Sequence, residues 1–252
     1  MVIEITSLSH TFNGSHEALL NIPRLTLGNR SLVSIVGSSG SGKSTLLRII
    51  AGLLSPTAGH VSLDGHSPQQ KRDAGELAFI FQSPTLLPWR TAMQNIVLPC
   101  ELQGGRLSRR QQDVHGLLSL VGLSEDDTRK RPAQLSGGMQ MRVSLARSLI
   151  TRPELMLMDE PFAALDDILR TQLQDEVRRI HCEQKIASVL VTHNIREAVA
   201  MSDRVLVLGD KPAQITTDVT VALPAERDSD VRRSREFQGI VNQVTDALYQ
   251  VV

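Results

Sequence analysis

The chain has 252 residues, 41% of them hydrophobic and 21% charged, which suits a single α/β domain that buries its own core. Its 27 basic and 27 acidic residues cancel, which argues against a general polyanion binder, so we expect no nucleic-acid partner. The first residues do not read as a secretory leader, and no apolar run approaches the roughly 20 residues of a membrane span. The sequence predicts a soluble, cytoplasmic protein that reaches a membrane only through a partner.

Short apolar runs alternate with helical patterns along the first third of the chain. The run at 32–36 has the pattern of a compact strand and ends in a Ser/Gly loop, and a helical pattern follows at 44–51. Short strands are predicted at 59–65, which closes in an Asp-Gly turn, and at 77–81. These hairpin-like early strands indicate an antiparallel layer.

The rest of the chain contains longer apolar runs. Helical spacing over about 91–123 is interrupted at Gly104-Gly105. Wholly apolar runs at 155–158, 187–191 and 205–208 fit parallel strands that are buried on both faces. Because helical patterns separate them, they predict an α/β fold with a mainly parallel sheet covered by helices.

A glycine-rich loop after the strand at 32–36 carries the strongest signal for function. It matches G-x-x-x-x-G-K-[ST] at every fixed position, which a random chain of this length shows roughly one time in a hundred. Its glycines let backbone N–H groups face phosphate oxygens, while Lys43 adds charge and Ser44 offers a hydroxyl to Mg²⁺. The predicted ATP-binding residues of this loop are Gly37, Ser38, Ser39, Gly40, Ser41, Gly42, Lys43, Ser44 and Thr45.

Two acids follow the apolar run at 155–158. The carboxyl edge of a parallel sheet is where ligands bind, so Asp159 is a candidate for holding Mg²⁺ and Glu160 for activating water. Acids in this position are also common as solvated strand ends. The glycine-rich loop upstream favours the catalytic interpretation, because phosphoryl transfer needs a cation site on this strand.

A second glycine-containing helix start follows Leu135. Ser136, Gly137 and Gly138 precede a helical pattern, so the backbone N–H groups there can face an anion. Taken by itself, an ordinary turn capped by Ser136 is the simpler interpretation.

These elements, in this order and over nearly the whole chain, resemble the ATPases of ATP-binding cassette (ABC) transporters. Residues 37–45 resemble the Walker A loop, 155–160 the Walker B strand and 135–140 the ABC signature. The resemblance implies a P-loop NTPase fold with an antiparallel β layer and a small helical subdomain.

Weaker positions gain a role from this resemblance. Gln82 resembles the Q-loop glutamine, which senses Mg²⁺ and the membrane partner, and His193 resembles the switch histidine that contacts the γ-phosphate. Residues 164–166 resemble the D-loop, and Phe12 resembles the aromatic residue that stacks on adenine. Without the resemblance, a lone Gln or His after a strand is more often polar surface or structural, and a lone Phe is usually core.

The resemblance also implies one nucleotide-binding domain over residues 1–252. Its catalytic core would comprise about 1–85 and 153–225, its helical subdomain about 86–152, and its C-terminal tail about 226–252. The charged stretch at 226–236 is expected to be solvated.

The family works as a head-to-tail homodimer in which each ATP lies between the Walker A loop of one chain and the signature of the other. Ser136, Gly137 and Gly138 would therefore contact ATP in trans. The implied catalytic residues are Glu160, His193, Lys43 and Gln82. The implied Mg²⁺ ligands are Ser44, Gln82 and Asp159.

The implied partners are integral membrane permease subunits and, indirectly, an extracytoplasmic solute-binding protein. The chain would then lie at the cytoplasmic face of the inner membrane as a peripheral subunit. Leu86, Leu87, Pro88 and Trp89 form a short apolar patch beside Gln82, which we expect either to receive a permease helix or to pack within the helical subdomain.

Three details resemble one branch of importers, those for nitrate, sulfonates, taurine and thiamine pyrimidine precursors. Met139 separates the signature glycines from Gln140, residues 86–91 read LLPWRT, and residues 223–228 read LPAERD. A further departure is Asn194, where Asp commonly follows the switch histidine. We expect it to have little effect, because the imidazole is the acting group.

Other functions explain fewer of these features. An ABC ATPase acting on nucleic acid or ribosomes usually has two cassettes or long insertions, and the balanced charge disfavours it. A P-loop kinase or GTPase leaves the signature, the D-loop and His193 unexplained. A nucleotide switch without hydrolysis has no need of Glu160 and His193, and an exporter half is often fused to membrane helices.

Overall fold

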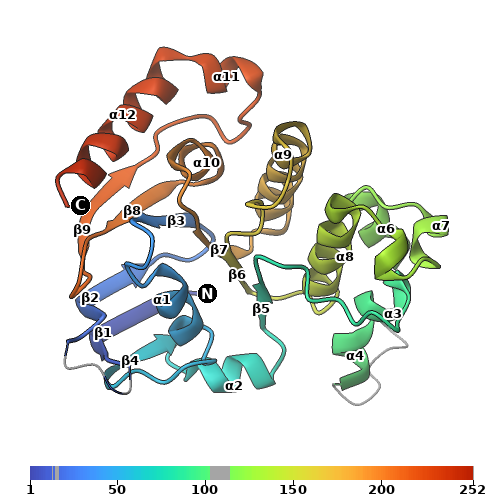
Figure 1. Ribbon diagram of the computed structural model, residues 1–252, viewed down its shortest axis with the longest axis horizontal. Helices are drawn as coiled ribbons and strands as arrows, with labels where there is room; N and C mark the ends of the chain where they lie inside the picture. Colours follow the sequence, from blue (N-terminus) through green and yellow to red (C-terminus); the bar gives the residue numbers. More distant parts are fainter. Residues whose placement is uncertain (13, 15–16, 103–113, 252) are drawn as a thin grey trace.

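The computed structural model describes residues 1–12, 14, 17–102 and 114–251, arranged as two sheets with flanking helices (Figure 1). The predicted break at Gly104-Gly105 lies outside the described residues. The strands are β1 (Ile3–His10), β2 (Leu20–Leu27), β3 (Leu32–Gly37), β4 (Ala58–Leu63), β5 (Leu77–Ile80), β6 (Leu155–Asp159), β7 (Ala187–Val191), β8 (Arg204–Leu208) and β9 (Ile215–Thr220).

The helices divide into those that cover the sheets and those of a separate helical region. The first group is α1 (Lys43–Ile50), α2 (Pro68–Asp73), α9 (Asp167–Gln184), α10 (Ile195–Met201), α11 (Ser229–Arg233) and α12 (Arg235–Tyr249). The second group is α3 (Ala92–Ile96), α4 (Leu98–Leu102), α6 (Val114–Leu120), α7 (Glu125–Thr128), the 3₁₀ turn η2 (Pro132–Gln134) and α8 (Gly137–Leu149).

The larger sheet has the strand order β5-β6-β7-β3-β8-β9, and only β9 runs antiparallel to its neighbour. Every residue of β3, β6 and β7 is buried, as expected for central strands with helices on both faces. The register pairs Asp159 with Val191, so β6 and β7 end side by side. The carboxyl ends of the central strands therefore share one edge, where their loops meet.

The smaller sheet has the order β2-β1-β4 and is antiparallel throughout, which confirms the predicted antiparallel layer. In β1 the inward residues alternate until Ser7, whose φ of 50° marks an irregularity in the pairing with β4. Gly59 faces this point with a φ of +77°, and a Cβ there would lie 2.2 Å from the Ser7 carbonyl oxygen. Only glycine fits this close approach.

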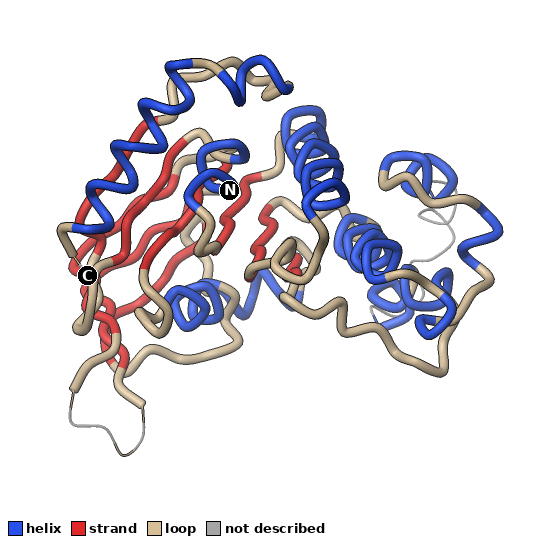
Figure 2. The backbone as a smooth tube through the Cα atoms, turned by 45° about the horizontal axis from the view of Figure 1, so that its top comes forward, coloured by secondary structure: helices blue, strands red, loops and turns tan. Residues whose placement is uncertain are grey.

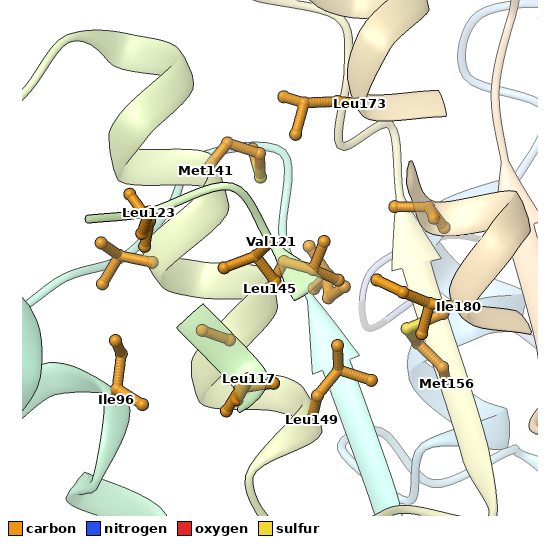
Figure 3. Close-up of a cluster of buried hydrophobic side chains, with 14 of the residues drawn as sticks. Ile96, Leu117, Val121, Leu123, Met141, Leu145, Leu149, Met156, Leu173 and Ile180 are labelled. Carbon is orange, nitrogen blue, oxygen red and sulfur yellow. The ribbon is translucent and has the colours of Figure 1, made fainter. Parts of the chain in front are cut away.

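The helical region shares an apolar core with the parallel sheet. Figure 3 shows Ile96, Val121 and Leu145 facing Met156 of β6 and Ile180 of α9 within one buried cluster. Leu86 is half-buried against the same cluster, whereas Trp89 is 67% exposed. The division of the chain at about 85 and 153 stays a prediction.

Helix α12 packs on α10, β8 and β9 along this end of the sheet, and α11 packs on α12 (Figures 1 and 2). The expectation of a fully solvated stretch at 226–236 is wrong at Arg227, which is only 4% exposed. Its guanidinium donates to the carbonyl oxygens of Val199 (2.8 Å) and Ser202 (3.3 Å), so it satisfies the last carbonyls of α10. None of the described helices has both the length and the apolar character that a membrane span needs.

Candidate nucleotide site

The glycine-rich loop connects β3 to α1 and has a backbone that side chains would disrupt. Gly42 has a φ of 101°, and a Cβ on it would lie 2.8 Å from Leu20 Cδ2. A Cβ on Gly37 would lie 2.7 Å from the carbonyl oxygen of Leu208. No side chain caps the N-terminus of α1, so its backbone N–H groups are free to bind an anion.

Lys43 is buried beneath this loop. Its ammonium donates to the carbonyl oxygens of Gly37 (3.0 Å) and Ser38 (2.7 Å). Burial lowers the pKa of Lys43, and the negative charges of Glu160 and Asp159 oppose that change. The lysine therefore lies between the loop and the acids at the end of β6, where its charge suits a bound phosphate chain.

Ser44 and Asp159 are linked directly. The Ser44 hydroxyl donates to Asp159 Oδ1 at 2.6 Å, although the two residues are 115 positions apart. Asp159 is buried, and Arg48 Nη2 lies 3.9 Å from its other oxygen. A hydroxyl and a carboxylate converging beside a phosphate-binding loop are hard oxygen donors, so this pair fits a Mg²⁺ site.

Glu160 and His193 form the second link across the sheet edge. The loops after β6 and β7 bring His193 Nδ1 to 2.9 Å from Glu160 Oε2. Glu160 has a φ of 47°, a left-handed conformation that is rare for a residue with a Cβ, and its N–H donates to the Val191 carbonyl at 2.9 Å. Such strain occurs at functional sites, where surrounding bonds enforce it.

The signature residues begin α8, as the simpler interpretation of a capped turn also predicts. The Ser136 hydroxyl accepts from the Met139 N–H at 3.3 Å. Gln140 donates to the carbonyl oxygens of Pro132 (3.0 Å) and Leu135 (3.3 Å), which fixes the approach to the helix. Ser136 and Gly137 are exposed, and no hydrogen bond among the described residues joins them to the loop of α1.

Comparison with known proteins agrees with this geometry. The sequence profile of the ABC transporter family matches residues 20–163. An aliphatic sulfonates import ATP-binding protein of Xanthomonas axonopodis pv. citri is 43% identical, over 85% of this chain and 84% of the relative. The nitrate import ATP-binding protein of Synechocystis is 37% identical, over 94% of this chain and 89% of the relative. The chain belongs to the ABC transporter family.

A solved structure supports the same conclusion about the fold of this ABC chain. The ATP-binding cassette MJ0796, described as a dimer in a post-hydrolysis state with ADP and Pi, has a TM-score of 0.76 to it. Sequence identity is 29%, and the match covers 87% of this chain and 98% of that one. The predicted ABC ATPase fold is therefore confirmed.

Three further predicted positions can be placed on the fold. Gln82 is exposed, two residues beyond β5, where that strand ends beside β6. Phe12 is 50% exposed, and its ring meets the ring of His10 edge-on at 4.9 Å. Asp166 of the D-loop caps α9 by accepting from Leu169 N–H at 3.0 Å. The functions of all three stay predictions.

Sequence reasoning missed the polar residues behind His193. Glu197 and Gln174 are buried and hydrogen-bonded to each other, at 2.9 Å between Gln174 Nε2 and Glu197 Oε2. The spacing of Asn194 and Glu197 matches a helix start with an acid at the third position, which is the signal that marks this turn. The pairing with Gln174 has no such local signal, because α9 is distant in sequence.

Proposed function

We propose that this chain is the ATP-binding and ATP-hydrolysing subunit of an ABC importer that takes up a small solute through a separate membrane permease. The observation that supports it most directly is the meeting of two pairs at one sheet edge, Ser44 with Asp159 and Glu160 with His193. Phosphoryl transfer needs a metal-binding group, a phosphate cradle and a group that activates water, and this edge supplies all three.

Each residue then has a distinct part. The N–H groups of the loop at 37–44 and the Lys43 ammonium hold the phosphates, and Phe12 stacks on adenine. Glu160 accepts a proton from the attacking water, and His193, hydrogen-bonded to it, contacts the γ-phosphate. Hydrolysis here depends mainly on positioning and electrostatic stabilisation.

Ser44, Gln82 and Asp159 would hold Mg²⁺. When bound, Mg²⁺ neutralises phosphate charge as it builds up during transfer. The direct Ser44–Asp159 contact supports this assignment, because both oxygens already point to one place. Gln82, at the open end of β5, would complete the site and report its state to the permease.

The signature would act on ATP bound by a second copy. Ser136 and Gly137 are exposed at the start of α8, where the Ser136 hydroxyl caps the Met139 N–H. In a head-to-tail homodimer this end would face the γ-phosphate of the partner's ATP. ATP would then stabilise the closed dimer, and hydrolysis would release it.

A permease would dock beside β5. A groove of about 320 Å³ lies there between the sheet edge and the helical region, and its lining includes Phe79, Leu102 and Arg147. Leu102, which lines this groove, and Trp89, which does not, are both largely exposed apolar side chains of the helical region. Such side chains suit contact with an apolar helix of a partner.

The related proteins named as sulfonate and nitrate importers support small anions as the transported solutes, with thiamine precursors as the alternative from the same branch. Selection of the solute would be made by the permease and an extracytoplasmic solute-binding protein. This chain would lie at the cytoplasmic face of the inner membrane. Assaying the ATPase of the copurified complex with candidate solutes would identify the one that stimulates it.

Replacing Glu160 tests the hydrolytic function. Unmodified protein should hydrolyse Mg-ATP, whereas Glu160→Gln should lower kcat by about two orders of magnitude or more, because the general base is lost while the shape is kept. Chelating Mg²⁺ with EDTA should stop hydrolysis by the unmodified protein. Phosphate release measures both effects.

The same variant tests the dimer. Glu160→Gln with saturating Mg-ATP should elute as a dimer in size-exclusion chromatography with light scattering, and it should return to a monomer with ADP. A protein that binds no nucleotide, or that stays monomeric in this variant with Mg-ATP, would refute the proposal.

Replacing Trp89 tests permease docking. Trp89→Ala should leave the ATPase activity of the isolated chain within about twofold of normal, since Trp89 is exposed, and should reduce transport by the complex about tenfold or more. Leu53→Ala, which removes another exposed apolar side chain, is the control. Undiminished transport by Trp89→Ala would contradict this part of the proposal.

A further inference from the structure

Glu197 is a carboxylate in an unusual place. It lies in the first turn of α10, four residues after His193, and is only 6% exposed. Its side chain accepts a hydrogen bond from Gln174 Nε2 at 2.9 Å and faces the Thr192 hydroxyl. An ionised carboxylate only accepts hydrogen bonds, so these neighbouring donor groups suit it. Burying an acid is costly, and its retention here needs a reason.

Glu197 contacts the residues on either side of His193 in the sequence, Thr192 and Asn194. Thr192 Oγ1, which faces the Glu197 carboxylate, accepts from the Asn194 N–H at 3.0 Å. Asn194 Oδ1 in turn accepts from the Glu197 N–H at 3.1 Å. Because the Thr192 hydroxyl also faces the Glu197 carboxylate, Thr192, Asn194 and Glu197 form a ring of polar contacts, and the residue between the first two in sequence is His193.

The ring is anchored to a second element that starts near the site. Gln174 is a buried residue of α9, the helix that begins at the D-loop residue Asp166. Arg170, one turn earlier on α9, donates to the carbonyl oxygens of Leu165 (2.6 Å) and Phe162 (3.3 Å). A cavity of about 80 Å³ is lined by Arg170, Glu197, Glu160 and His193 together.

We propose that Glu197 is a positioning residue for ATP hydrolysis, which holds the loop of His193 at the distance where the imidazole bonds Glu160 and ties that loop to α9. This inference rests on the proposed ATPase function. Glu197 does not touch the reacting atoms itself. Its effect is transmitted through Thr192 and Asn194, which fix the backbone on either side of the histidine.

The electrostatics of Glu197 agree with this geometry. Burial raises its pKa, while the Thr192 hydroxyl, the hydrogen bond from Gln174 and the charges of Arg170 and His193 oppose that rise. The groups that favour the ionised form of Glu197 thus belong to the loop of His193 and to α9, the two elements that Glu197 connects. A buried acid with a purely structural role also needs hydrogen-bond partners to offset the cost of burial, but those partners could come from any part of the fold.

A double-mutant cycle with His193 tests the inference. Glu197→Ala should lower kcat for ATP about tenfold and leave the KM for ATP within about twofold, because nucleotide binding does not use the ring. Glu197→Gln should retain most of kcat, because its carbonyl can still accept from Gln174 and its shape is unchanged. On a His193→Ala background, Glu197→Ala should change kcat by less than about twofold. Glu236→Gln, the same chemical change on the exposed start of α12, is the control.

A second measurement does not depend on activity. The ring signals of His193 in an NMR spectrum, assigned by their loss in His193→Ala, should shift in Glu197→Ala and stay in place in Glu236→Gln. Equal losses of kcat with and without His193, full activity of Glu197→Ala, or unmoved His193 signals would each overturn the inference. Lack of hydrolysis by the unmodified protein would overturn the proposed function instead, and the NMR comparison would still decide whether Glu197 positions His193.

Discussion

Two helix N-termini in this protein have similar sequences before them and opposite local structures. At α1 the residue before the helix is Gly42 in a left-handed conformation, and no side chain caps the helix. At α8 the residue before the helix is Ser136 in an extended conformation, and its hydroxyl occupies the Met139 N–H. Both ends are rich in Gly and Ser, yet α8 has a capping side chain on its third N–H and α1 has none.

The surroundings of the two helix ends differ in the same sense. The start of α1 is joined within the chain to β6 through Ser44 and Asp159. The start of α8 lies in the helical region, with Ser136 and Gly137 exposed (Figure 1). Within the described part of the chain, the start of α1 is thus tied to the acid at the end of β6, whereas the start of α8 presents exposed residues with no hydrogen bond to that site.

The largest expected effect is at the first helix end. Gly42→Ala should weaken ATP binding about a hundredfold or more, because a Cβ at a φ of 101° and 2.8 Å from Leu20 would force the loop open. Gly116→Ala is the matched control, since none of the described residues has an atom within 4 Å of a Cβ at that position on α6. Binding of a fluorescent ATP analogue measures both. Normal ATP affinity in Gly42→Ala would show that the uncapped, left-handed start of α1 is not what distinguishes it from α8 as a nucleotide site.

The second effect separates binding in one chain from binding between chains. Gly137→Glu should keep the affinity of the monomer for ATP within about twofold, yet lose the Mg-ATP-dependent dimer and lower hydrolysis about a hundredfold. The fold should tolerate the change, because a Cβ on Gly137 meets nothing and an acid suits a helix N-terminus. Gly137→Gln, of the same size without the charge, should be affected less. Equal loss of monomer binding would show that the signature acts within its own chain.

The smallest effect on nucleotide should come from a change remote from both ends. Burial opposes ionisation of Asp203, but the nearby His181 ring and hydrogen bonds from the Leu32 N–H and Arg178 outweigh it and hold the pKa of Asp203 below its ordinary range. A lowered pKa in the folded state stabilises the protein above about pH 4, and this stabilisation is lost as the pH falls toward the folded pKa.

Asp203→Asn should therefore lower Tm by several degrees near neutral pH, by a margin that shrinks below about pH 4, with ATP affinity within about twofold of normal. Thermal unfolding followed by circular dichroism across pH gives the comparison. If the Tm difference between the unmodified protein and Asp203→Asn grew at lower pH, the ionised Asp203 would not be the source of the stabilisation. Weakened ATP binding by Asp203→Asn would show that this residue affects the nucleotide site.

Much of the fold and of the site could be predicted because the signals are local. The strands at 32–36, 155–158 and 187–191 are continuous apolar runs, and the loop between β3 and α1 has a fixed spacing of Gly, Lys and Ser. No strand was predicted at β1, where the irregularity at Ser7 breaks the alternation of inward and outward residues. A pattern of period two cannot identify a strand across such a break.

What the sequence did not predict depends on contacts between distant residues. Glu197 and Arg227 are charged residues in polar stretches, where solvent exposure is the ordinary expectation. Glu197 is buried because α9 brings Gln174 to it, and Arg227 is buried because the end of α10 offers it carbonyl groups. Neither partner can be identified by periodicity, since tertiary packing alone selects it.

Arg147 gives α8 a function at its other end. This 13-residue helix has Ser136 at its start and, near its end, a guanidinium that donates to the carbonyl oxygens of Pro84 (2.8 Å) and Thr85 (2.9 Å), just after Gln82. A helix of this length spans about 20 Å, so a tilt of about 10° at one end moves the other by about 3 Å. If a movement near Gln82 tilted this helix, Ser136 would shift by about the length of one hydrogen bond. A shift of that size is enough to make or break a hydrogen bond at the serine.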